Sequence, residues 1–200
     1  NKVAWDNDFS FEYGKNFTDQ NNWRKNVDKI DFSSKFGYAA SKKLFYTVLV
    51  DFKSQFDKGY NYPNDSVYES KFMSPAYSIT SLGIDYKPNN TFSAYISPAT
   101  GKFTFVLDDS LSHIGAYGVE IDKKFRPEIG AYAKFAYNAD IMKNVNLISK
   151  IDFFTAYDEN FGNVDINWEV LLGMKINKYL TATISTTLKY DDDTKYIDEN

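Results

Sequence analysis

Residues 163–190 read NVDINWEVLLGMKINKYLTATISTTLKY, and they contain two runs in which apolar and polar residues alternate. In the first run the apolar positions are Val164, Ile166, Trp168, Val170, Leu172, Met174 and Ile176. The second run alternates in the same way from Leu180 to Tyr190. A period of two predicts strands with one apolar and one polar face. Both runs exceed the ~5–6 residues of an ordinary strand and match the ~9–11 residues of a tilted membrane-spanning strand.

Seven earlier segments alternate in the same way, so the chain is predicted to contain about nine strands. They are residues 3–13, 27–38, 44–56, 73–87, 92–107, 125–137 and 145–157. The fifth of these is expected to bend near Pro98 or Gly101, because proline removes a ladder donor and glycine permits a bulge.

The links between the predicted strands alternate in length. Short links are residues 39–43, 88–91, 138–144 and 177–178, and long or polar links are residues 14–26, 57–72, 108–124 and 158–162. Short turns at one rim and long loops at the other are typical of bacterial outer-membrane barrels. The sequence therefore predicts an all-β, transmembrane, antiparallel up-and-down barrel.

Composition agrees with this prediction and excludes several other classes. The absence of cysteine excludes a disulfide framework, and the lack of a run of ~18 apolar residues excludes a membrane-spanning helix. A net charge of -4 with mixed signs argues against nucleic-acid binding. We expect one barrel domain over residues 1–200, no cofactor, and membrane lipid and other outer-membrane or surface proteins as partners.

Aromatic residues make up 18% of the chain, with 17 Phe and 16 Tyr. Membrane barrels place aromatic girdles at both membrane interfaces. The residues expected there are Trp5, Tyr46, Tyr86, Tyr137, Tyr157, Trp168 and Tyr190.

An odd number of strands would leave the barrel open, because single-chain bacterial barrels have an even number. An open edge in lipid would leave backbone groups unpaired. We therefore expect about 10–12 strands in the intact protein, with at least one strand after Asn200.

Several segments resemble a family of Bacteroidota outer-membrane proteins catalogued as a domain of unknown function, number 3078. They are residues 59–65 (GYNYPND), 97–102 (SPATGK), 140–145 (DIMKNV), 167–180 (NWEVLLGMKINKYL) and 190–193 (YDDD). The resemblance extends over nearly the whole chain. It implies a signal peptide, about twelve strands and a closing strand that ends in an aromatic residue, so that this chain is truncated at both ends. It implies no activity.

Charged residues occupy many positions on the predicted inner face. They are Asp31, Lys35, Asp51, Lys53, Asp85, Lys87, Arg126, Glu128, Lys134, Lys150, Asp152, Glu169 and Lys175. Such residues can form a selective polar pathway, or they can pair across strands and brace a narrow barrel. We favour bracing, because side chains can fill the interior of a small barrel.

Other motifs carry weaker signals. His113 is the only histidine and follows Asp108, Asp109 and Ser110, but proximity in a loop is weak evidence for a catalytic site. Residues 191–193 (DDD) lack the spacing of an EF-hand, and a solvated acidic loop is favoured over a calcium site.

Three aromatic residues in the predicted long loops are candidates for partner contact. Trp23 lies in a polar segment, and Tyr60 and Tyr62 lie in another. The two tyrosines can equally well pack their loop against the barrel, and the sequence leaves that choice open.

The sequence favours a non-enzymatic outer-membrane barrel with a blocked lumen and a structural or accessory role in an envelope assembly. The first alternative is a narrow pore or transporter for small polar solutes. The second is an outer-membrane hydrolase that depends on His113. A soluble barrel around an apolar ligand is a further alternative, and it would reverse the two faces.

Overall fold

The computed structural model describes residues 2–18, 22–157 and 162–191. Strands dominate this part of the chain, together with one short α-helix and one 3-10 turn. The elements are β1 (Val3–Thr18), β2 (Asn22–Ala39), β3 (Leu44–Ser54), β4 (Gly59–Tyr60), β5 (Tyr68–Ser70), β6 (Ala76–Tyr86), β7 (Phe92–Phe105), α1 (Asp109–His113), η1 (Ala116–Gly118), β8 (Phe125–Met142), β9 (Val145–Ala156), β10 (Asp165–Lys175) and β11 (Thr181–Tyr190).

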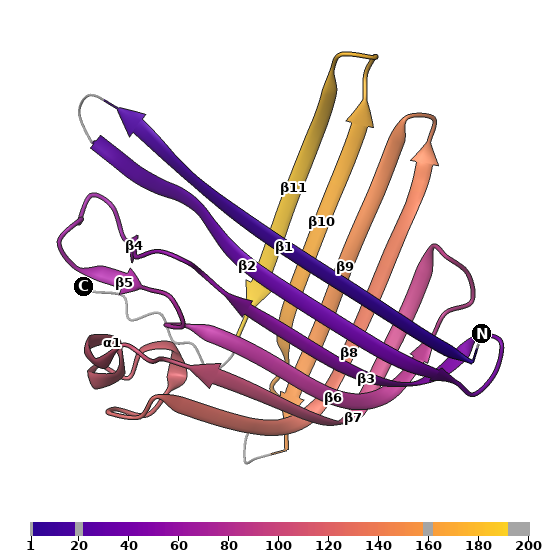
Figure 1. Ribbon diagram of the computed structural model, residues 1–200, viewed down its shortest axis with the longest axis horizontal. Coiled ribbons are helices and arrows are strands. Elements are labelled where there is room, and N and C mark those ends of the chain that lie inside the picture. The colour runs from indigo at the N-terminus through magenta and orange to yellow at the C-terminus, as the bar shows by residue number, and fades with distance from the viewer. Residues whose placement is uncertain (1, 19–21, 158–161, 192–200) are drawn as a thin grey trace.

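Nine strands form one antiparallel sheet in the order β1-β2-β3-β6-β7-β8-β9-β10-β11, and β4 pairs with β5 separately. The sheet curls into a half-barrel, so that β1 and β2 lie across the concavity from β9 and β10 (Figure 1). Within the described residues, β1 and β11 are the two edges and each pairs with a single neighbour. The prediction of an all-β, up-and-down, barrel-like fold with about nine strands is confirmed.

The alternation of the sequence separates the two faces of this sheet. Trp168 pairs with Leu188, and the next pair along the ladder is Glu169 with Thr187. Because paired residues share a face, the apolar pair lies on the convex side and the polar pair on the concave side. Trp168 is 43% exposed and Ile129 is 70% exposed. The apolar rows therefore face outward.

A small apolar core lies inside the concavity. Leu49, Tyr95, Tyr132 and Phe154 are buried and form one cluster. The rings of Tyr95 and Tyr132 lie 6.3 Å apart, and the Tyr95 hydroxyl is hydrogen-bonded to the Ser81 hydroxyl. Side chains from β3, β7, β8 and β9 thus fill this part of the interior.

The links alternate in length as predicted, with two corrections, and most of the link predicted at residues 158–162 lies outside the described residues. Residues 14–26 do not form a loop, because β1 and β2 continue as a paired arm to Thr18 and Asn22. A register shift between Gly14 and Lys15 lets the ladder continue through this polar segment. The link expected at residues 138–144 is also shorter, because β8 extends to Met142.

The predicted bend in β7 is present as a bulge. The register shifts between Ser97 and Thr100 on the side of β8. In β6 and β8, the two strands that flank β7, one glycine lies very close to the backbone of an adjacent strand. A Cβ atom would lie 2.2 Å from the Ile96 carbonyl oxygen at Gly83, and 2.0 Å from the Thr155 carbonyl oxygen at Gly130. These two positions therefore require glycine.

The long links after β3 and β7 fold together at one end of the sheet. Val106, Leu111 and Val119 are buried there and pack against Tyr68 and Tyr117. Among the described residues, no helix has the length and apolar character needed to cross a membrane.

Candidate functional site

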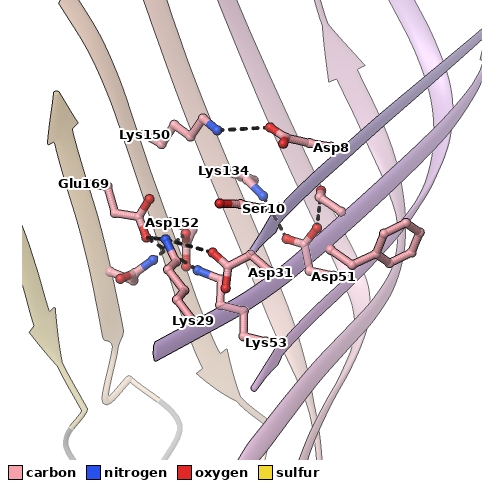
Figure 2. Close-up of a pocket in the computed structure, with 13 residues that line it drawn as sticks. Asp8, Ser10, Lys29, Asp31, Asp51, Lys53, Lys134, Lys150, Asp152 and Glu169 are labelled. Atoms are coloured by element: carbon pink, nitrogen blue, oxygen red, sulfur yellow. Dashed lines mark hydrogen bonds and ion pairs between the residues drawn. The ribbon is translucent and has the colours of Figure 1, made fainter. Parts of the chain in front are cut away.

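The candidate site is a cavity on the concave face, with a volume of about 250 Å³. Six strands contribute its lining, and charged side chains of both signs converge in it (Figure 2). The lining residues are Asp8, Ser10, Lys29, Asp31, Phe32, Ser33, Asp51, Lys53, Lys134, Lys150, Asp152, Asn167 and Glu169.

Ion pairs cross the cavity between strands that are not neighbours in the sheet. Lys134 Nζ of β8 lies 2.8 Å from Asp51 Oδ2 of β3, and Lys150 of β9 lies 3.5 Å from Asp8 of β1. Glu169 of β10 lies 3.7 Å from Lys53 of β3 and 3.9 Å from Lys29 of β2. These contacts hold the two walls of the half-barrel together across its concave side.

Burial differs greatly among these pairs. Asp51 is 6% exposed, and it also accepts a hydrogen bond from the Ser33 hydroxyl. The side chains of Lys150 and Asp8 are 46% and 67% exposed. A buried pair interacts strongly and depends on both partners, whereas an exposed pair is screened by water. Asp51 and Lys134 are therefore the central pair of the network.

Two further ionic clusters lie toward the ends of the concave face. Near the short turns, the side chain of Asp85 contacts Lys35 at 3.0 Å and Lys87 at 3.5 Å. Toward the long links, Glu128 contacts Lys102 at 3.7 Å and Arg126 at 3.2 Å. Polar contacts thus extend along the whole concave face.

The structure places the predicted lumen residues on one face, but it does not bring all of them together. Asp152 accepts a hydrogen bond from the Asn167 amide. Lys175 is exposed at the end of β10, and no ion pair of this residue is seen within the described part of the chain. The sequence prediction omitted five residues that pair on this face, namely Asp6, Asp8, Lys29, Lys102 and Asp165. Their alternation with apolar neighbours in the sequence would have been enough to place them on the inner face.

The predicted interface aromatics lie near the two ends of the convex face. Strand pairing places Trp5, Tyr46, Tyr86 and Tyr137 toward the short turns, and it places Tyr157, Trp168 and Tyr190 toward the long links. All seven are exposed. The indole nitrogens of Trp5 and Trp168 donate hydrogen bonds to the hydroxyls of Ser34 and Ser149.

The three candidate partner residues lie close to one another in the fold. Trp23 belongs to β2 rather than to a loop, and its ring lies 5.3 Å from the ring of Phe17. The Tyr62 hydroxyl accepts a hydrogen bond from the Lys25 backbone, and the Arg24 guanidinium lies over the Tyr62 ring. Tyr60 is half-buried in β4 beside Tyr62. The two tyrosines thus pack their loop against β2.

The link after β3 is anchored to the arm through Asp57. Its carboxylate accepts hydrogen bonds from Lys15 Nζ at 2.9 Å and from the Tyr13 hydroxyl at 2.7 Å. The Lys58 backbone donates a further bond. The hydrogen bonds from Lys15, Tyr13 and Lys58, in this order, lower the pKa of Asp57 to about 2.

His113 pairs with an exposed aspartate and is not hydrogen-bonded to a nucleophile among the described residues. Its exposed ring pairs with Asp122, which is also exposed. The neighbouring Ser112 is buried, and its hydroxyl donates to the Lys123 carbonyl oxygen. Within the described residues, no hydroxyl is hydrogen-bonded to His113. In the same residues, no group of three or more His, Asp or Glu side chains is placed to hold a metal ion, and Asp192 and Asp193 lie outside them.

Comparison with known proteins gives a match to a family model. A family model described as "Protein of unknown function (DUF3078)" matches residues 1–60, which include β1 to β4. It supports the expected domain of unknown function for this part of the chain. The segments that carry the resemblance lie outside the match, except for Gly59 and Tyr60. No curated protein and no solved structure matches the chain.

Proposed function

We propose that this chain is a bacterial outer-membrane β-barrel protein with a structural or accessory role in a cell-envelope assembly. The observation that carries the proposal is the inverted polarity of the sheet. Large apolar side chains are exposed over the convex face, while carboxylates and lysines pair inside the concavity. A water-soluble barrel around an apolar ligand would have the opposite arrangement.

The amount of exposed apolar surface favours a lipid environment for the convex face. Trp5, Phe9, Leu82, Ile96 and Ile129 are each more than half exposed, and they lie on four different strands. Soluble monomers rarely expose apolar patches larger than a few hundred Å². Lipid tails cover such a surface at no cost, and the aromatic residues at both ends suit the two membrane interfaces.

The filled interior favours a structural role over transport. The Leu49, Tyr95, Tyr132 and Phe154 cluster occupies the wall of the concavity, and the Asp51 and Lys134 pair spans it. A conducting pore keeps a continuous water-filled lumen. A braced interior is expected of a barrel that acts through its loops and its outer surface.

Lipid-borne quenchers test the membrane placement. Because the chain contains no cysteine, single cysteines can be introduced at Ile129 and Ile184 on the convex face and at Lys150 on the concave face. After labelling with a fluorophore and insertion into vesicles with nitroxide-labelled lipids, we expect strong quenching at residues 129 and 184. Lys150→Cys is the matched control and should remain unquenched. Equal quenching at all three positions, or quenching at residue 150 alone, would contradict the proposal.

A narrow pore is the second candidate function. The cavity of about 250 Å³ on the concave face is the observation that favours it. This volume is lined by charges of both signs, which would suit small polar solutes. Conductance measurements distinguish this function from the structural one.

A further inference from the structure

The β1–β2 arm is the paired segment of residues 15–18 and 22–25, beyond the register shift at Gly14. It carries exposed aromatic side chains near its tip. Trp23 is 66% exposed and Phe17 is 52% exposed, and their rings lie 5.3 Å apart near the tip of the arm. Figure 1 shows this arm extending beyond β3, which pairs with β2 only from Ile30 onward. The proposed membrane placement does not explain why these two apolar rings are exposed.

The length of β1 places the tip above the lipid. β1 has 16 residues, so at ~3.3 Å per residue and a tilt of ~45° it rises about 37 Å. The apolar band of a membrane barrel is only about 25 Å tall. If the band begins at the short-turn end, where Val3 and Trp5 lie, the last several residues of β1 extend into water.

A layer of charges separates the tip from the apolar face below it. Lys15 pairs with Asp57 at 2.9 Å, and Lys25 pairs with Asp28 at 2.7 Å. Lys15 and Asp57 contact Tyr13, which continues the outward-facing row of β1, and charges on the outward face of a membrane barrel are disfavoured within the lipid. Phe17 and Trp23 lie on the far side of this layer, so lipid does not cover them.

Arg24 adds a charge that has no carboxylate partner among the residues that the structure describes. Its guanidinium lies 4.5 Å from the centre of the Tyr62 ring, and its Nε is buried without a hydrogen-bond partner in the described residues. Lys15 and Lys25 have carboxylate partners, whereas no carboxylate of the described chain lies within ion-pair distance of Arg24. A half-buried guanidinium of this kind can pair with a carboxylate supplied by another protein.

We propose that the tip of the β1–β2 arm is the docking site for a folded protein that has an apolar pocket with an acidic rim. Trp, Tyr, Phe and Arg are the residues that dominate the centres of protein interfaces. The two rings project from the tip of the two-stranded arm, and an apolar pocket in a folded protein can enclose both of them. The pocket receives Trp23 and Phe17, and an acidic residue at its rim pairs with Arg24. This inference rests on the proposed membrane placement and names the partner of that accessory role.

The test uses the photo-reactive amino acid p-benzoylphenylalanine at position 23 or 17 in living cells. The matched control carries it at Ile121, which is 67% exposed on the neighbouring long link. We expect one discrete protein adduct from positions 23 and 17 and none from position 121. The partner is then identified by mass spectrometry, purified, and titrated against the detergent-solubilised chain.

The titration decides the proposal. We expect Trp23→Ala to weaken binding at least about 30-fold, as for a central interface residue, and Ile121→Ala to leave binding unchanged. Arg24→Gln should weaken binding and reduce its dependence on salt. Adducts to lipid, adducts to a second copy of the chain, absence of adducts, or an unchanged affinity for Trp23→Ala would each overturn the proposal.

Failure of this test is distinguishable from failure of the proposed function. Quenching at Ile129 without cross-linking at residue 23 would remove only the docking site. Absence of quenching at Ile129 would remove the membrane placement and, with it, the length argument for the arm.

Discussion

At the level of single residues, the concave face depends most on charges that are sealed from water. Asp51 is nearly inaccessible, and Lys134 is the cation that neutralises it. Removing one member of a buried pair leaves a desolvated charge, which costs more than the pair itself contributes. A substitution at residue 134 is therefore expected to lower the stability of the protein more than a substitution of the exposed lysines around the same cavity.

Lys134→Met is expected to lower the free energy of unfolding by about 3–5 kcal/mol, because the hydrogen bond from Ser33 is then the one polar contact left to the Asp51 carboxylate among the described residues. Denaturation in urea, followed by circular dichroism in detergent, measures this loss. The double variant Asp51→Asn, Lys134→Met should recover most of it.

Lys150→Met is the control for this prediction, because its contact with Asp8 is long and both side chains are well exposed. We expect it to cost less than about 1 kcal/mol. Equal losses for Lys134→Met and Lys150→Met would show that burial does not govern the network.

At the level of elements, glycine controls how closely β8 and β9 approach. A Cβ atom at Gly130 would lie 2.0 Å from the Thr155 carbonyl oxygen, whereas a Cβ atom at Gly173 would meet nothing within 4 Å. We expect Gly130→Ala to destabilise the protein by about 1–3 kcal/mol through this overlap and Gly173→Ala to be nearly neutral. Urea denaturation of the two variants compares them directly, and similar midpoints would contradict the structure.

The anchoring of the β1–β2 arm is expected to depend on pH through Asp57. Its pKa is about 2 in the folded protein and about 3.9 in an unfolded chain. A lowered pKa means that the carboxylate stabilises the arm above pH ~4, and this contribution is lost as the pH falls toward 2. The fluorescence anisotropy of Trp23, in a chain with Trp5→Phe and Trp168→Phe, reports the loosening.

Asp57→Asn provides the comparison for this titration. It removes the ionisable anchor, so the arm should be looser at pH 7 and show no transition between pH 4 and 2. An identical acid transition in both chains would assign the effect to other carboxylates.

The strands themselves were predictable, because side-chain alternation is a local property of the sequence. Residues 163–190 define β10 and β11 almost to their ends. The arm was missed because residues 14–26 are polar, and polarity alone indicated a loop. Pairing across the register shift at Gly14 depends on the partner strand, which a single segment does not reveal.

At the level of the whole molecule, the sheet positions charges that the sequence separates widely. Asp51 and Lys134 are 83 positions apart in the chain, and they meet because the sheet curls. Alternation predicted that both point inward, but it did not predict which charges would meet, because that depends on strand tilt and curvature. The same curl packs Tyr95 against Tyr132 and fills part of the interior with apolar side chains.

The filled interior leads to a prediction for ion flow, which separates the structural function from the pore. We expect the protein to show no stable conductance steps in planar bilayers, because side chains occupy the concave face. The double variant Tyr95→Ala, Tyr132→Ala removes two of the four residues of the apolar cluster and should introduce small steps. Tyr179→Ala is the control, because Tyr179 is 86% exposed on a short turn, and gel mobility verifies that each variant folds. Stable ohmic steps from the unmodified protein would instead favour the pore, with the charged cavity as its constriction.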